Sequence, residues 1–370
     1  MYRQDCRFFT GYKPCRQQSQ CDGCSAYIPM GARVLILKLG AIGDALRTTP
    51  VLAALKKRHG ELTVTWVTDD ASYPLLEGIP GISRLMRLNF ASFIVLQAEH
   101  FHLLLNFDKA PEACGFAAAM KADRKEGFSL TGEGKLSIYN SESAYAYDLG
   151  LFDDLKFKRN KLSYQEIIFS MAGLPFQGEE YELSLSPQEL SFGEAYIFSR
   201  GIADRFPLIG LNTGCGDIFA TKKWALEGFV ALAETARREL GAEILLLGGP
   251  AETERNRLIE EKISFPVHNT GNNNTLKQFA SFIRRCHLVV SADTTALHMA
   301  IALKVPVVAL FGPTCHSEIY LYGRGEKVVS DFPCAPCYRG NCEKEPRCMD
   351  SIRAGEVMAK ITSVFSRLFP

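Results

Sequence analysis

The chain has 370 residues, of which 47% are hydrophobic, and a formal net charge of +1 at pH 7. This length allows two domains of ordinary size, and the balanced charge argues against wholesale nucleic-acid binding. No uncharged apolar run approaches the ~18 residues of a membrane-spanning helix, and the N-terminus lacks the apolar segment of a signal peptide. We therefore expect a cytoplasmic protein whose contact with a membrane, if any, is peripheral.

Residues 1–30 form a polar extension that is rich in cysteine. Four of the twelve cysteines crowd into it with the spacing C-x8-C-x5-C-x2-C: Cys6, Cys15, Cys21 and Cys24. In a reducing compartment such a cluster is more typical of a metal site than of disulfides, so a structural zinc is expected, with reduced thiols as the alternative. A second cluster over 334–348 predicts a metal less strongly, because a loop rich in Pro and Cys has the same appearance.

Residues 31–190 alternate predicted strands with predicted helices. Val34–Leu37 is a short apolar run typical of a buried strand, a glycine turn follows it, and an apolar-periodic segment predicts one helix that ends at Gly60. Further strands are expected at 62–68, 101–107 and 122–128, with helices at 75–78, 113–120 and 164–172. Residues 131–161 lose the periodicity and predict a long loop or lid. The alternation indicates a parallel, doubly wound α/β sheet.

A second α/β domain is expected over 205–349, after an inter-domain linker within 176–206. Its strands are predicted at 208–211, 244–247, 288–291 and 305–311, and its helices at 226–240, 276–285 and 292–303. An amphipathic helix is expected at 354–368. The chain is therefore predicted to be an α/β protein of two lobes that face a central cleft.

The first glycine turn places a carboxylate at the mouth of the predicted crevice. Asp44 follows the carboxyl end of the first strand, where ligands bind in open α/β sheets. One interpretation is a helix-capping aspartate that satisfies free backbone N–H groups. The other is a general base, because a helix N-terminus favours the anion and keeps it ready to accept a proton at neutral pH.

The second half carries the residue types of a nucleotide site. Thr294 and Thr295 stand where a strand passes into a helix, and their hydroxyls and free N–H groups suit a diphosphate. Asp293 is the expected N-cap of that helix. His298 lies one turn further on, within reach of a phosphate or ribose, although a core histidine bonded to a carbonyl fits the local sequence as well.

Two further side chains extend this predicted site. Lys222 would neutralise a leaving diphosphate, or else be a solvated surface lysine; Glu252 would accept hydrogen bonds from ribose hydroxyls, or else favour a helix dipole. No P-loop pattern occurs, so the usual NTPase machinery is not expected. The glycine spacing at Gly40 and Gly43 is not the dinucleotide fingerprint, which leaves a hydride-transfer enzyme as a distant alternative.

Several segments resemble the heptosyltransferases of glycosyltransferase family 9. The two specific motifs are KLGAIGDALRTTPVLAALKKRHG at 38–60 and VVSADTTALHMAIALKVPVVALFGPT at 289–314; looser ones are K-x-W at 222–224, GGPAETE at 248–254 and RKEGF at 124–128. The resemblance implies the GT-B architecture of two Rossmann-like domains, with the acceptor bound by residues 31–190 and the nucleotide sugar by 205–349. It also implies that the last helix, within 350–370, packs back on the first domain.

The same resemblance implies an inverting transfer of heptose from ADP-heptose to a lipopolysaccharide-core or related glycan acceptor at the inner face of the membrane, with no essential metal. Asp44 would be the base and Lys222 would act on the diphosphate. The remaining implied roles are donor binding by Thr213, Glu252, Asn274, Asp293, Thr294, Thr295 and His298, and acceptor binding by Arg47 and Arg124.

The sequence departs from the family pattern at two places. Thr295 stands where the family usually has glycine, which adds a Cβ and a hydroxyl beside the diphosphate, and the cysteine-bearing extension is absent from the best-known members. Two alternatives therefore stay open: a GT-B transferase that uses another nucleotide sugar, and a catalytically idle binding or scaffold protein of the same fold.

Overall fold

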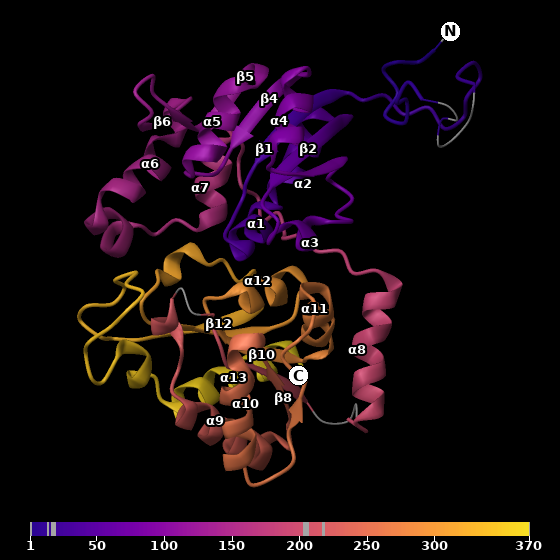
Figure 1. Ribbon diagram of the computed structural model, residues 1–370. Coiled ribbons are helices and arrows are strands. Elements are labelled where there is room, and N and C mark those ends of the chain that lie inside the picture. Colours follow the sequence, from indigo (N-terminus) through magenta and orange to yellow (C-terminus); the bar gives the residue numbers. More distant parts are fainter. Residues whose placement is uncertain (1, 13–14, 16–19, 203–206, 217–218, 370) are drawn as a thin grey trace. The chain divides into compact units, whose positions relative to one another are not determined.

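The computed structural model describes residues 2–12, 15, 20–202, 207–216 and 219–369 (Figure 1). The chain divides into two compact units. The first comprises Met1–Leu151 and Glu166–Glu179, and the second comprises Phe152–Gln165 and Glu180–Pro370. Each unit has its own sheet covered by helices, so the predicted α/β class with two Rossmann-like domains is confirmed. The cleft between them stays a prediction.

The first unit is built on a sheet with the order β3-β2-β1-β4-β5-β6, in which only β6 runs antiparallel to its neighbour among the described strands. The strands are β1 (Ala32–Leu37), β2 (Leu62–Thr68), β3 (Arg84–Arg87), β4 (His100–Asn106), β5 (Lys121–Leu130) and β6 (Leu136–Ile138). The apolar run Val34–Leu37 is fully buried in the central strand. The strand order reverses between β1 and β4, which is the position where such sheets bind ligands.

Helices connect these strands. They are α1 (Ile42–Thr48), α2 (Val51–His59), α3 (Tyr73–Leu76), α4 (Phe90–Gln97), α5 (Pro111–Ala119), α6 (Ala144–Leu151) and α7 (Tyr164–Met171). The single helix expected up to Gly60 is two helices, because Pro50 has no N–H to donate and its ring clashes with the preceding turn.

Three features of the first unit were missed or mispredicted. Residues 131–161 are not one long loop, because the first unit's part of them contains β6, α6 and a short turn of helix at Ser141–Ser143. A second turn of helix, Leu155–Arg159, belongs to the second unit. The edge strand β3 is half-exposed and lacks an apolar alternation, so the sequence pattern did not predict it. The start of α4 had a readable signal, since Asn89 and Ser92 form a capping box.

The glycine of the RKEGF motif is required by the sheet itself. Gly127 has a φ of +95°, and a Cβ there would lie 2.0 Å from the backbone oxygen of Asn106 on β4. Only glycine allows this conformation and this close approach. The motif therefore marks a structural feature of β5.

The second unit has a fully parallel sheet with the order β12-β11-β10-β7-β8-β9 over its described strands. They are β7 (Leu208–Asn212), β8 (Glu243–Leu247), β9 (His268–Asn269), β10 (Leu288–Ala292), β11 (Val307–Phe311) and β12 (Gly325–Val329). The helices are α8 (Pro187–Ser199), α9 (Leu226–Leu240), α10 (Thr253–Lys262), α11 (Leu276–Arg285), α12 (Thr295–Ala302) and α13 (Ala354–Leu368). Counted from β7, the strand order is that of the first sheet, and it reverses between β7 and β10.

The predicted linker within 176–206 contains a helix of 13 residues, α8. Ser186 and Glu189 form a capping box that starts α8, and the helix packs on α11 through Phe192 and Tyr196, whose rings lie 5.5 and 5.0 Å from that of Phe282. Residues 203–206 of the predicted linker lie outside the described residues. The linker interpretation missed this helix although the capping box and Pro187 at its first position mark its start.

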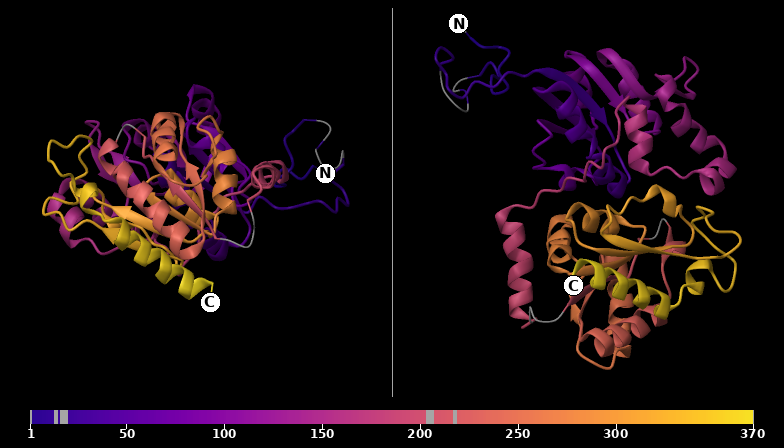
Figure 2. Two further views of the ribbon diagram at one scale, coloured as in Figure 1. Left: turned by 90° about the horizontal axis from the view of Figure 1, so that it is seen from below. Right: turned by 180° about the vertical axis from the view of Figure 1, so that it is seen from behind.

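The last helix packs on the second unit, so the prediction that it returns to the first domain is wrong. Val357, Ile361 and Val364 of α13 are fully buried in the core that surrounds Trp224. The helix contacts α9 and β12, and Figure 2 shows it in yellow along the second unit. The Trp224 indole also donates to the carbonyl of Ile352, just before α13, at 2.9 Å. The amphipathic pattern predicts an apolar face but does not say which core the face covers.

Among the described residues, no helix combines the length and the hydropathy needed to cross a bilayer.

Candidate active site

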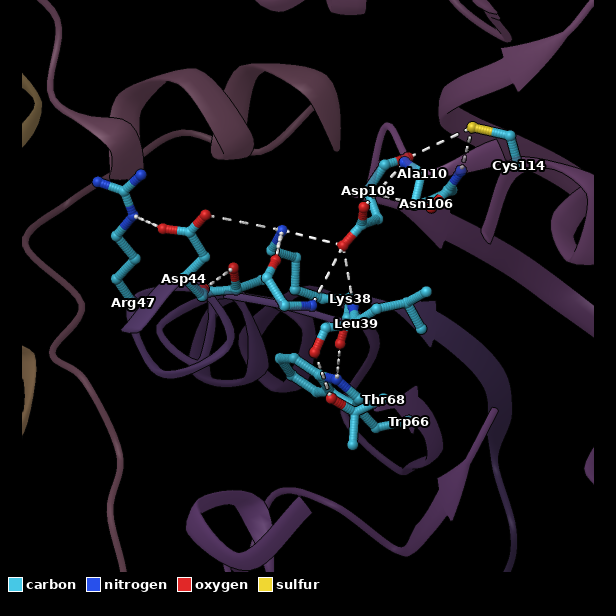
Figure 3. Close-up of polar contacts among 12 residues, drawn as sticks. Lys38, Leu39, Asp44, Arg47, Trp66, Thr68, Asn106, Asp108, Ala110 and Cys114 are labelled. Atoms are coloured by element: carbon cyan, nitrogen blue, oxygen red, sulfur yellow. Dashed lines mark hydrogen bonds and ion pairs between the residues drawn. The ribbon is translucent and has the colours of Figure 1, made fainter. Parts of the chain in front are cut away.

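Asp44 follows the carboxyl end of β1, where the first sheet reverses its strand order between β1 and β4. Figure 3 shows its side chain between those of Arg47 and Lys38. Asp44 is the third residue of α1, whose N-cap is Ala41, so it is not the capping residue. One carboxylate oxygen lies 3.0 Å from Arg47 Nε and the other 3.9 Å from Lys38 Nζ, and the side chain is 35% exposed. A partly exposed carboxylate between two cations and at a helix start is favoured in its ionised form, as a general base requires.

A second carboxylate, Asp108, lies beneath this turn and was not predicted as part of the site. Its Oδ2 is 3.0 Å from Lys38 Nζ, and it accepts hydrogen bonds from the backbone N–H groups of Leu39 and Ala110. Burial opposes its ionisation, but the Lys38 ammonium and these hydrogen bonds outweigh burial and hold the pKa of Asp108 below its ordinary value. The available signal was its position directly after a buried strand.

The two arginines predicted to bind the acceptor are not brought together. Arg47 is beside Asp44, whereas Arg124 lies on β5, pairs with Glu126 and lines a polar cavity of about 340 Å³ with Arg58. Arg58 is near the C-terminal end of α2, which directly precedes β2, so this cavity belongs to the amino-terminal edge of the sheet. The geometry therefore separates Arg124 from the base.

Lys222 is part of the polar cluster at the reversal point of the second sheet. It ends a short helical turn, Ala220–Lys222, and its ammonium donates to the Asp293 carbonyl at 2.9 Å and lies 3.5 Å from the Asp293 carboxylate. Both side chains are 17% exposed. The alternative of a solvated surface lysine is therefore wrong.

The α12 N-terminus has a different cap from the one predicted. Its N-cap residue is Thr294, one position after Asp293, and Thr295 is the first helical residue. The Thr294 hydroxyl accepts a hydrogen bond from Asn212 Nδ2 at 3.2 Å and lies 3.1 Å from Ser291 Oγ. Asn212 and Ser291 were not predicted, but each ends or nearly ends a buried strand, β7 or β10.

His298 is buried one turn into α12. Its Nε2 lies 3.6 Å from the Asp293 carboxylate, its ring stacks on Tyr181 at 6.2 Å, and its Nδ1 has no hydrogen-bond partner among the described residues. The ring is buried as a core histidine would be, yet the neighbour of its Nε2 is a carboxylate. One ring nitrogen is left available to a ligand.

Glu252 is a buried carboxylate with one unused oxygen. Its Oε2 accepts from the Gly249 N–H at 2.9 Å, while Oε1 has no partner within the described part of the chain. A Cβ on Gly214 would lie 2.0 Å from this Oε1, so glycine in the β7 turn makes room for the carboxylate. A buried carboxylate oxygen normally has a hydrogen-bond partner, and a ribose hydroxyl would supply one.

The side chains of Thr213 and Asn274, also predicted to bind the nucleotide sugar, make hydrogen bonds within the protein. The Thr213 hydroxyl donates to Asn256 Oδ1. The Asn274 amide donates to the carbonyls of Thr270 and Gly271 at 3.2 and 3.1 Å. Both side chains hold turns at the carboxyl edge of the second sheet.

The predicted zinc site is not supported. Cys6, Cys15, Cys21 and Cys24 line one small cavity of about 20 Å³, and Cys334, Cys337, Cys342 and Cys348 line another of about 20 Å³. However, within the described residues no group of three or more Cys, His, Asp or Glu side chains is placed to hold a metal ion. Cys6, Cys21 and Cys24 of the first cluster and all four cysteines of the second are free thiols.

The sequence and fold match one family. The model of "Glycosyltransferase family 9 (heptosyltransferase)" matches residues 96–347. The chain belongs to glycosyltransferase family 9. A relative, the lipopolysaccharide core heptosyltransferase OpsX of Haemophilus influenzae, is 25% identical over 324 residues, covering 84% of this chain and 86% of the relative.

Solved structures agree with this family 9 fold. A glycosyltransferase family 9 protein from Veillonella parvula superposes with a TM-score of 0.72 at 19% identity, covering 91% of this chain and 98% of that one. The ADP-heptose lps heptosyltransferase II of E. coli gives a TM-score of 0.65 at 17% identity, over 90% and 99% of the two chains. The predicted heptosyltransferase family and GT-B fold are therefore confirmed.

Proposed function

We propose that this family 9 glycosyltransferase moves a heptose from ADP-heptose to a lipopolysaccharide-core or related glycan acceptor, with inversion at the anomeric carbon and without a metal. The OpsX relative acts on a lipopolysaccharide core by its name, and the E. coli neighbour is named for ADP-heptose. The acceptor would be a glycolipid at the inner face of the membrane.

In this proposal Asp44 accepts the proton of the acceptor hydroxyl. The hydroxyl oxygen forms a bond to the anomeric carbon as the bond from that carbon to the diphosphate oxygen breaks, and ADP leaves with the electron pair. A single displacement of this kind inverts the configuration. Two nearby cations, Lys38 and Arg47, support the role because they favour the carboxylate form before the proton arrives.

The second unit would hold ADP. Lys222 and the free N–H groups at the start of α12 would take the diphosphate, because an ammonium and a helix N-terminus both stabilise negative charge. Glu252 would accept hydrogen bonds from the ribose, and Asp293 and His298 would lie beside the diphosphate. The observation that carries the proposal is the placement of Asp44 and of the Lys222–Asp293 pair, each at the reversal point of its own sheet.

The test is turnover with the whole chain. We expect purified protein to release ADP from ADP-heptose only when heptose-deficient lipopolysaccharide core is added, and NMR of the product to give the anomeric configuration opposite to the donor's. Failure to release ADP with any such acceptor would overturn the proposal. Retention of configuration would overturn the single displacement alone.

A different nucleotide is the second candidate, because Thr295 adds bulk where the family pattern has glycine. Thermal shifts with ADP, UDP and GDP separate the two possibilities, since a ligand at 100 times its dissociation constant adds about 2.7 kcal/mol to the stability of the fold. The proposal expects the largest shift with ADP.

A further inference from the structure

A buried lysine lies between two carboxylates at the carboxyl end of β1. Lys38 Nζ is 3.0 Å from Asp108 Oδ2 and 3.9 Å from Asp44 Oδ2, and only 7% of its side chain is exposed (Figure 3). It also donates to the carbonyl of Gly40. The Lys38 ammonium therefore contacts the proposed base Asp44, the deeper carboxylate of Asp108 and the turn that leads from β1 into α1.

The deeper carboxylate fixes the backbone of that turn. Asp108 Oδ2 accepts from the N–H groups of Leu39 at 3.0 Å and Gly40 at 3.4 Å, and its Oδ1 accepts from Ala110 at 3.0 Å. The segment after β4 is thus bonded to the segment after β1. These are charge-assisted hydrogen bonds, which are stronger than neutral ones.

The turn is held from its other side by β2. Trp66 Nε1 donates to the carbonyl of Lys38 at 3.4 Å, and the Thr68 hydroxyl donates to the carbonyl of Leu39 at 3.0 Å. The backbone is therefore bonded through its N–H groups to Asp108 and through its carbonyls to Lys38, Trp66 and Thr68. Helix α1 begins immediately after this turn, so the turn sets where Asp44 lies.

A buried ion pair adds little net stability, because the loss of hydration offsets most of the attraction between the charges. An uncharged side chain at position 38 would leave the backbone hydrogen bonds that Asp108 accepts from Leu39, Gly40 and Ala110 in place. The presence of a buried ammonium close to the proposed base therefore points to a task for its charge.

We propose that Lys38 and Asp108 are positioning residues for Asp44: Asp108 fixes the turn from which α1 starts, and Lys38 keeps the Asp44 carboxylate ionised and oriented. This inference rests on the proposed function, in which Asp44 is the base. Lys38 and Asp108 do not themselves contact the substrate in this account.

Other charged groups near the turn set the background for any pH effect. Within the first unit these are Arg47 on α1, Asp108 after β4 and Asp69 after β2, whose carboxylate would lie 2.9 Å from a Cβ on Gly40. Lys38→Met leaves all three in place and keeps most of the apolar stem of the side chain. It therefore removes one charge and little volume.

The experiment is a double-mutant cycle with Lys38→Met and Asp44→Asn in the full chain. We expect Lys38→Met alone to lower kcat about 10- to 100-fold, as a displaced catalytic group does, with an unchanged KM for ADP-heptose. The acid limb of its pH profile of kcat/KM moves to higher pH. In the Asp44→Asn background we expect Lys38→Met to lower kcat by less than about threefold, because the effects of residues that act as a unit are not additive.

If Lys38→Met lowered kcat by the same factor in both backgrounds, or left the acid limb of the pH profile of kcat/KM unchanged, the inference would be overturned. The proposed function would still stand. Full turnover in Asp44→Asn would overturn the proposed function itself. If Lys38→Met fails to fold, a second double-mutant cycle with Asp108→Asn and Asp44→Asn tests the inference. We again expect the effects of the two substitutions on kcat to be non-additive.

The matched control is Asp70→Asn. Asp70 follows β2, pairs with Arg87 at 2.8 Å and has an 87% exposed side chain, so it undergoes the same chemical change outside the network. We expect its kcat, KM and pH profile to equal those of the unmodified chain. A drop in kcat here equal to that of Asp108→Asn would remove the specificity on which the inference depends.

Discussion

The two sheets share one strand order but place different chemistry at the point where that order reverses. Between β1 and β4 the side chains are charged and paired, with Lys38 between the carboxylates of Asp44 and Asp108. Between β7 and β10 one ion pair, Lys222 with Asp293, is accompanied by an amide and hydroxyls, with Asn212 Nδ2 3.1 Å from Ser291 Oγ and 3.2 Å from Thr294 Oγ1.

The difference shows how one backbone arrangement serves two tasks. Fixed ion pairs hold a single carboxylate in one place and one protonation state, which suits proton transfer. Neutral donors, a helix start and one ammonium offer several hydrogen bonds to a large anion, which suits a diphosphate. The following predictions test this division.

The largest effect is expected at the first reversal point. Asp44→Asn keeps the shape of the side chain and removes its basicity, so we expect kcat to fall about 10²- to 10⁴-fold, the usual contribution of a general base. Steady-state kinetics with ADP-heptose and acceptor measure this change. We expect ADP affinity, measured by calorimetry, to stay unchanged, because in the proposed function ADP binds to the second unit.

If Asp44→Asn lowered ADP affinity and left turnover unchanged, proton transfer and diphosphate binding would not be divided between the two reversal points as proposed. Asp70→Asn is the control, since Asp70 is exposed and on the same unit.

The next effect is expected at the second reversal point. Lys222→Met removes the ammonium that lies 3.5 Å from Asp293 Oδ2, and we expect kcat/KM to fall about 10²- to 10³-fold, as when one donor to a developing anion is lost. In contrast to Asp44→Asn, this variant also binds ADP more weakly. Steady-state kinetics measure the fall in kcat/KM, and calorimetry measures the loss of ADP affinity.

Lys262→Met, at the exposed end of α10, is the matched control and should change neither quantity. If Lys222→Met bound ADP with unchanged affinity, the ammonium would have no part in holding the diphosphate.

A smaller effect is expected at the ribose. Glu252→Gln keeps an oxygen for the Gly249 N–H and removes the charge at the unpartnered Oε1, so ADP affinity should fall about 10-fold, in line with the loss of a charged hydrogen bond. The sharper readout is discrimination. The unmodified chain should prefer ADP over 2′,3′-dideoxy-ADP, and Glu252→Gln should reduce that preference; an equal preference in both would exclude the ribose role.

Much of this division was readable from the sequence because it follows from local patterns. The strand at 62–68 and the helices at 226–240, 276–285 and 354–368 were predicted with their observed bounds, since apolar periodicity and Gly241 or Thr275 mark them clearly. Asp44 and Lys222 followed from their places after predicted strands and from the family motifs.

What was missed depends on contacts between distant segments. Asp108 is 70 residues from Lys38, and only the pairing of β4 with β1 brings them together. The wrong placement of α13 has the same origin, because its apolar face fits the core around Trp224 for reasons of shape that a periodicity does not contain. Arg124 was grouped with Arg47 by motif, whereas the strand direction separates them.

The smallest effect is expected from metal removal. In the proposed mechanism Lys222 and the α12 N-terminus neutralise the leaving diphosphate, so a divalent cation has no charge left to balance. EDTA should therefore change the kcat of the unmodified chain by less than about twofold, and Mg²⁺ should not restore Lys222→Met. Turnover that stops in EDTA and returns with Mg²⁺ would instead place a metal at the diphosphate. The second reversal point would then differ from the first by bound metal as well as by its side chains.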